Sequence, residues 1–278
     1  MTYGSFFNLF SKFSPLYIEM LKNPVAKISW QEKLRASAIH LGISLCIAAL
    51  AAFLVFGLWF PYPYRELSGG RELFLLMLGV DVVLGPLLTF VIFNSKKRMR
   101  ERLLDFSIIG ALQLTALGYG LWTVYESRPV HLVFEHQRMV AVAASDLEPA
   151  LLVKALLQYQ SLPVSGPTLL SIRTYKDENE KSESELMTMM GVPPAAQPEL
   201  WQPYSTAQTE LLKAVLPIET LRTRFSSKKE LIDQSITATG KSADQLGYLP
   251  LQGRNSIWTV LIDTTSAQPV GFIPLDPS

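Results

Sequence analysis

Three long apolar stretches dominate the first half of the sequence, at residues 36–60, 73–93 and 106–125. The first and third contain no Asp, Glu, Lys or Arg, and the second contains a single charged residue, Asp81. Because an α-helix rises about 1.5 Å per residue, roughly 20 residues cross the ~30 Å hydrocarbon core of a bilayer. The pattern therefore predicts three transmembrane α-helices. The aromatic run at 59–64 is predicted to form an interfacial belt, as are Trp122 and Tyr125.

Residues 126–278 show a different pattern, in which short apolar runs alternate with polar turns. Runs typical of strands lie at residues 130–134, 139–143, 169–174, 248–251, 257–263 and 270–275. Capping boxes at Ser145–Glu148 and Ser227–Glu230 predict two helices, one to about Tyr159 and one ending before Gly240. The charged run at 176–185 indicates a solvated loop or a helix start, and the proline-rich stretch at 191–203 a loop. We expect a mixed α/β domain with an antiparallel sheet.

Basic residues around the apolar stretches predict their orientation. Five Lys or Arg precede the first stretch, and five lie at residues 96–102, between the second and third stretches. The loop between the first and second stretches carries only two. Lys and Arg collect on the cytoplasmic side of a membrane. The N-terminus is therefore expected in the cytoplasm and residues 126–278 outside it. Residues 1–35 leave two interpretations open: an amphipathic helix on the membrane surface, or a weakly ordered extension.

Overall charge and motif content narrow the class of protein. The net charge is +1, with +5 on residues 1–125 and −4 on residues 126–278, which disfavours a nucleic-acid binder. A single cysteine excludes an internal disulfide framework. The chain has no phosphate-binding glycine loop, no H-E-x-x-H and no G-x-S-x-G, and the acidic run at 177–185 matches no calcium loop. We therefore expect no catalytic residue, no metal site and no cofactor.

Asp81 carries the strongest chemical signal. A carboxylate within a bilayer costs at least about 2.5 kcal/mol on insertion scales unless it is paired or protonated. One explanation is a hydrogen bond to another span, with Gln113, Thr115 or Tyr119 as the candidates. A second is a docking site for a partner helix, and a third is a proton or ion path.

Gly85 and Pro86 follow Asp81 closely. A proline removes a backbone donor, and the carbonyl that it leaves free needs another partner. We therefore expect close helix contact at this point. His40, near the predicted cytoplasmic end of the first span, is expected to reach the membrane surface.

Several motifs resemble a known family. They are Gly69–Leu73, Gly79–Thr89, Leu112–Leu114, Tyr119–Trp122 and Arg128–Val130. From about residue 34 to residue 278 the chain resembles the TfpX/TfpZ family of type IV pilin accessory proteins. The resemblance implies a multi-pass protein of the bacterial inner membrane with a periplasmic C-terminal domain. It also implies a chaperone or accessory role in pilus assembly, and it transfers no catalytic residue.

These observations give a specific hypothesis about partners. A pilin awaiting assembly is an apolar helix in the lipid bilayer that carries a globular head outside it. We expect its helix to be contacted by a set of residues in the spans, namely Asp81, Gly85, Pro86, Gln113 and Tyr119. Residues 126–278 are expected to contact its head. The alternatives are a membrane-anchored ligand-binding or sensor protein, and a membrane enzyme or transporter subunit.

Overall fold

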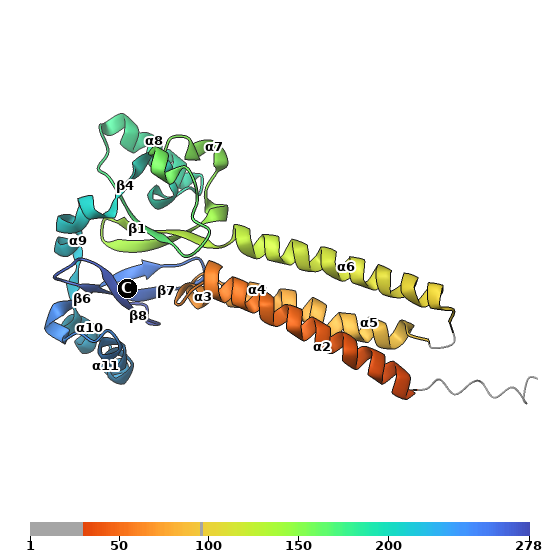
Figure 1. Cartoon of the computed structure of the whole chain (residues 1–278). Coiled ribbons are helices and arrows are strands. Elements are labelled where there is room, and N and C mark those ends of the chain that lie inside the picture. The colour runs from red at the N-terminus through yellow and green to blue at the C-terminus, as the bar shows by residue number, and fades with distance from the viewer. Residues whose placement is uncertain (1–29, 95–96) are drawn as a thin grey trace, which may run out of the picture.

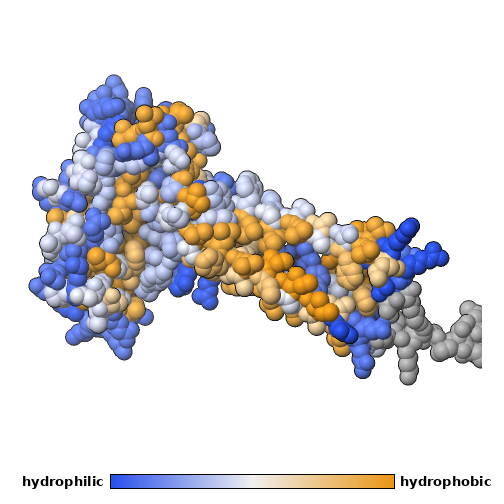
Figure 2. All heavy atoms as spheres, viewed as in Figure 1, coloured by the Kyte–Doolittle hydropathy of each residue, from blue (hydrophilic) through white to orange (hydrophobic). Residues whose placement is uncertain are grey.

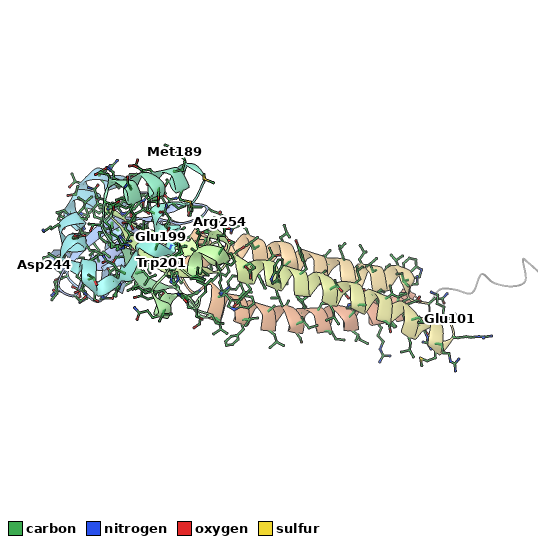
Figure 3. The ribbon with its side chains drawn as sticks, turned by 90° about the horizontal axis from the view of Figure 1, so that it is seen from above. Glu101, Met189, Glu199, Trp201, Asp244 and Arg254 are labelled. Carbon is green, nitrogen blue, oxygen red and sulfur yellow. The ribbon has the colours of Figure 1, made fainter. Side chains whose placement is uncertain are left out.

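The computed structural model describes residues 30–94 and 97–278. Long helices form a stalk that projects from a globular head, which comprises residues 129–278 (Figure 1). Figure 3 labels Glu101 at the free end of the stalk and Asp244 at the opposite end of the molecule, on the head. The predictions for the N-terminal extension fall on residues 1–29, outside the described residues.

Three helical segments are long and apolar enough to cross a membrane: Trp30–Trp59, Gly70–Ile92 and Met99–Glu126. They contain the three stretches predicted from hydropathy, apart from the terminal residues Phe60 and Phe93, and they begin three to seven residues earlier. Their elements are α2 (Trp30–Leu54), η1 (Val55–Trp59), α4 (Gly70–Gly79), η2 (Val80–Leu84), α5 (Gly85–Ile92) and α6 (Met99–Glu126). A single turn, α3 (Tyr64–Leu67), joins the first segment to the second. Most of the stalk surface is apolar, as expected for lipid contact (Figure 2).

The head is built on an eight-stranded sheet with the order β4-β3-β1-β2-β6-β7-β8, and β5 pairs with β6. The strands are β1 (Pro129–Glu135), β2 (Arg138–Ala143), β3 (Thr168–Ile172), β4 (Trp201–Pro203), β5 (Leu216–Pro217), β6 (Leu246–Gln252), β7 (Ile257–Asp263) and β8 (Pro269–Ile273). The prediction of an antiparallel sheet is wrong for two pairings, since β1 with β3 and β2 with β6 are parallel. Both join strands separated by long connections, and local alternation carries no information on their direction.

Helices cover the sheet. They are α7 (Pro149–Leu152), α8 (Glu178–Met189), α9 (Gln208–Ala214), α10 (Ile218–Arg224) and α11 (Lys229–Ala238). The predicted helix from Ser145 to Tyr159 is wrong, because only α7 and short 3₁₀ turns form there. The Gln160 side chain donates to the carbonyls of Val153 and Ala155, 3.1 Å away in each case. It thereby occupies acceptors that a continuing helix would use. The charged run at 176–185 proves to start a helix, α8, and α11 ends before Gly240 as predicted.

Alternation along the strands divides the core into layers. On β1, Leu132 and Phe134 face a central cluster, whereas Val133 faces a second cluster on the other side of the sheet. On β7, Val260 and Ile262 join the central cluster and Leu261 a third, which α10 and α11 cover. The period of two expected of strands with both faces buried is therefore present in both halves of the sheet.

The stalk and the head share part of one hydrophobic core. Tyr64 and Leu67 of α3 are buried within the central cluster of the head. The backbone N–H of Asn255 donates to the Leu67 carbonyl, at 3.4 Å, and the N–H of Gly166 donates to the Leu58 carbonyl, at 3.0 Å. We call this contact region the joint. Because core residues and backbone hydrogen bonds both cross it, the joint holds the head in a fixed orientation on the stalk.

The joint explains why part of the predicted aromatic belt is wrong. Trp59, Phe60 and Tyr64 are buried in protein and not displayed at a surface. The rings of Trp59 and Tyr125 pack edge to face, with centroids 5.1 Å apart. Trp122 is exposed, and its role at a membrane interface stays a prediction.

His131 makes the stability of the head dependent on pH. Its Nδ1 atom lies 2.7 Å from Thr168 Oγ1, its ring packs on Trp201, and burial lowers its pKa to about 4. The unfolded chain takes up this proton near pH 6.5, so the folded state loses stability as the pH falls from about 6.5 to 4. We expect a loss of at most about 3 kcal/mol. Chemical unfolding at pH 7 and pH 4.5 measures it.

A His131→Gln variant provides the control for this pH effect, because glutamine keeps a polar contact to Thr168 but does not titrate. Its stability should change less between the two pH values than that of the wild-type protein. An equal change in both proteins would contradict the assignment to His131.

Candidate partner-binding groove

A chain of hydrogen bonds ties the three stalk segments together. His40 on α2 lies 2.5 Å from Thr89 Oγ1 on α5 through Nδ1, and 2.8 Å from Gln113 Oε1 on α6 through Nε2. An amide oxygen only accepts, so Nε2 donates to Gln113, and in the neutral ring Nδ1 accepts from the Thr89 hydroxyl. Ser37 also donates to the Pro86 carbonyl, at 2.6 Å. These contacts hold α2, α5 and α6 in register.

The next link of the chain depends on a helix defect. Asp81 lies in η2, a π-helical turn, where its carbonyl would receive the N–H of residue 86, five positions later. Residue 86 is proline and has no N–H. Instead Gln113 Nε2 donates to the Asp81 carbonyl, at 3.2 Å. The predicted need for a partner near Gly85 and Pro86 is therefore confirmed.

Gly85 makes room for this contact. A Cβ atom at position 85 would lie 1.9 Å from Gln113 Nε2 and 2.8 Å from Gln113 Cδ. Any larger residue would displace the amide from the Asp81 carbonyl. Gly85 thus acts through Gln113, and it does not itself line the groove described below.

The Asp81 carboxylate is left without a partner. Its side chain is buried, and neither oxygen makes a hydrogen bond to any of the residues described. The expected hydrogen bond from this carboxylate to Gln113, Thr115 or Tyr119 is therefore wrong. Gln113 binds the backbone carbonyl of Asp81, and Thr115 donates to Ala111 within its own helix, at 2.8 Å.

Tyr119 lies away from the site. It is six residues after Gln113, which corresponds to a rotation of roughly 240° around α6. Its ring is exposed and packs beside Trp122, with centroids 6.0 Å apart. Of the five residues predicted to bind a partner, four are brought together and Tyr119 is not.

A groove opens in front of Asp81. It has a volume of about 180 Å³ and lies between α2 and α6, against α4 and η2. Its lining residues are His40, Ile43, Ser44, Ile47, Ala48, Met77, Leu78, Asp81, Gly110, Gln113, Leu114 and Leu117. The groove is thus mostly apolar and contains an unpaired carboxylate. In Figure 2 a small hydrophilic area interrupts the apolar surface about midway along the stalk.

His40 is the residue that sequence reasoning misplaced. It was expected at the membrane surface, but it is bound between Thr89 and Gln113. A usable signal was present in the sequence. Histidine and glutamine are rare in long apolar helices, and two such residues on different helices satisfy each other at low cost.

The Thr89 hydroxyl is expected to stabilise the stalk, since it is fully buried against His40. Thr89→Val keeps the shape and leaves His40 Nδ1 without a donor, which should cost about 1–2 kcal/mol. Thr115→Val is the matched control, because Thr115 is exposed and bonds only within α6. Unfolding in mixed detergent micelles compares the two. Equal losses would contradict the proposed role of the His40 contact.

Other chemistry is not evident. Within residues 30–94 and 97–278 there is no group of three His, Cys, Asp or Glu side chains that could hold a metal ion. The acidic run in α8 instead makes ion pairs, of which Arg173 with Glu180 is the closest, at 2.7 Å. Hydrogen bonds from Arg173 and the Lys176 backbone lower the pKa of Glu180 to about 2. These contacts fix α8 on the head.

The structure therefore defines a class of protein: three membrane-length helices with a lateral groove, joined through shared core packing to a mixed α/β head. Comparison with known proteins narrows this class to a family. The fimbrial assembly protein FimB family matches residues 28–69. A fimbrial assembly protein of serogroup I from Dichelobacter nodosus is 35% identical over 231 residues, which cover 82% of this chain and 90% of that protein. The chain belongs to this family of fimbrial assembly proteins.

Other relatives agree. The serogroup E1 protein of Dichelobacter nodosus is 32% identical over the same shares of both chains. The protein of serogroups C1 and C2 is 43% identical over 113 residues, which are 41% of this chain and 86% of that protein. No solved structure matches the chain.

Proposed function

We propose that this protein is an inner-membrane accessory factor, or chaperone, for a type IV pilin. The stalk crosses the membrane three times with the N-terminus in the cytoplasm, and the head lies in the periplasm. The groove receives the apolar helix of the pilin while the pilin waits in the bilayer, and the head lies beside the pilin's globular part. This role requires no catalytic chemistry and no cofactor.

The unpaired Asp81 carboxylate is the observation that carries the proposal. A buried acid without a partner is costly in lipid, and that cost is removed if an incoming helix supplies a hydrogen-bond donor. The groove in front of Asp81 is apolar and opens between two helices, as a lipid-borne partner requires. Membership of a fimbrial assembly family supports a fimbrial subunit as that partner.

Two glycines on α6 allow a direct test. Gly110 lines the groove and Gly118 does not, and a Cβ at either position meets nothing within 4 Å. Gly110→Leu should therefore fill the groove without disturbing the stalk, and Gly118→Leu adds the same side chain outside the groove. We expect Gly110→Leu alone to reduce the pilin that co-purifies with the protein in detergent. Equal co-purification with both variants would contradict binding in the groove.

A deletion strain separates two forms of the role. Loss of surface fimbriae with normal pilin levels would point to extraction of pilin from the membrane, whereas loss of pilin would point to its protection.

Reporter fusions at the C-terminus test the topology. Activity of a cytoplasmic reporter there would contradict the periplasmic position of the head.

A further inference from the structure

The head carries an exposed apolar patch beside the stalk. We define this patch as Val153, Leu156, Leu157 and Val164, whose side chains are between 50% and 86% exposed. Apolar atoms cover this side of the head, where it faces the stalk, above the end of α6 (Figure 2). Exposed leucines on one segment need an explanation, because soluble surfaces seldom display grouped large apolar side chains.

Two contacts fix the level of this patch. The N–H of Gly166 donates to the carbonyl of Leu58, in the last turn of the first membrane-length segment. Arg128, two residues after the end of α6, donates to the Pro163 carbonyl at 3.2 Å and to the Tyr125 carbonyl at 2.8 Å. The segment that carries the patch is therefore bound to the head-side ends of both the first and the third membrane-length helices.

Local hydrogen bonds and a turn fix the backbone conformation of the segment that carries the patch. Gln160 binds the carbonyls of Val153 and Ala155, and a 3₁₀ turn follows at Leu157–Tyr159. One basic residue lies within the segment that carries the patch, Lys154, which is half exposed and lies 3.7 Å from Glu199. Grouped apolar side chains with a partly exposed lysine among them are typical of surfaces that bind at a membrane interface.

We propose that the patch inserts into the outer leaflet of the bilayer that the stalk crosses. The lipid-facing surface of the stalk then continues onto the head, and the head rests on the membrane. Leucine and valine side chains enter the boundary between headgroups and acyl chains, and the half-exposed Lys154 with its partner Glu199 lies at the level of the headgroups. The inference rests on the proposed membrane insertion of the stalk.

The test uses the full chain in nanodiscs of phosphatidylcholine and phosphatidylglycerol, on a Cys46→Ser background. An environment-sensitive dye is attached after Leu157→Cys, after Leu50→Cys or after Asp244→Cys. Leu50 is an exposed residue of the stalk and Asp244 lies at the far end of the head (Figure 3). Lipids that carry a nitroxide near the top of the acyl chain then quench any dye in the membrane.

We expect the dye at position 157 to lose most of its fluorescence and to shift its emission to the blue, as at position 50, while position 244 is unaffected. Quenching at 50 but not at 157 would overturn the inference and leave the proposed function intact. An absence of quenching at 50 would overturn membrane insertion and this inference together.

Discussion

Asp81→Asn is expected to lower the pilin that co-purifies with this protein about tenfold, and to remove most surface fimbriae. The substitution keeps the size of the side chain but removes the charge that a partner donor would meet. Losing a charge-assisted hydrogen bond in a buried site costs about 1.5–3 kcal/mol, and ~1.4 kcal/mol is a factor of ten in affinity. Immunoblots of pilin after detergent purification, together with electron microscopy of whole cells, measure both effects.

Asp105→Asn provides the control, because Asp105 is a carboxylate on α6 that already has a partner, Lys97, at 2.6 Å. This variant should bind pilin normally. The assignment fails if Asp81→Asn accumulates to wild-type levels and supports normal co-purification and normal fimbriae.

Gly253→Ala is expected to loosen the head from the stalk. A Cβ atom at this position would lie 2.4 Å from Leu67 Cγ and 2.6 Å from the Leu67 backbone oxygen, within the joint. The backbone oxygen cannot yield without moving α3, so the variant should lose about 1–3 kcal/mol of stability. That loss corresponds to a decrease in Tm of several degrees, which intrinsic tryptophan fluorescence detects in detergent.

Gly42→Ala is the matched control, since a Cβ at position 42 meets nothing within 4 Å. It should unfold at the wild-type temperature or slightly above it, because alanine favours helix. If Gly253→Ala and Gly42→Ala unfold at the same temperature, the joint does not hold the head as described.

Hydropathy alone predicted the three stalk helices, because the hydrocarbon thickness fixes how many apolar residues are needed. Six of the eight strands were predictable from alternation, and β1, β2 and β7 match closely. The prediction of a loop over residues 191–203 is wrong at β4, and β5 lies where no element was predicted. The parallel pairings were not predictable, because they depend on which distant strands meet. No element was predicted over α9 and α10, because they contribute only a few apolar residues to the clusters on the sheet and show no clear helical period.

The candidate site was predictable in part. An acid in an apolar stretch and a nearby proline indicated the part of the second stalk segment that lines the groove and contacts Gln113. The partners of the polar groups were not predictable, because they depend on the rotation of each helix. His40 is turned toward Gln113 and Tyr119 is turned away, and spacing along one helix fixes neither orientation relative to another.

Under the proposed function, the joint also limits which molecules the protein can hold. Core residues and backbone hydrogen bonds cross the joint, so the fold sets the separation between Asp81 in the groove and the surface of the head. A pilin held as proposed would have to match two points at once, with its hydrogen-bond donor at the depth of Asp81 and its folded part at the height of the head. The protein would then work as a length gauge that accepts subunits of the correct reach and leaves other single-helix membrane proteins unbound.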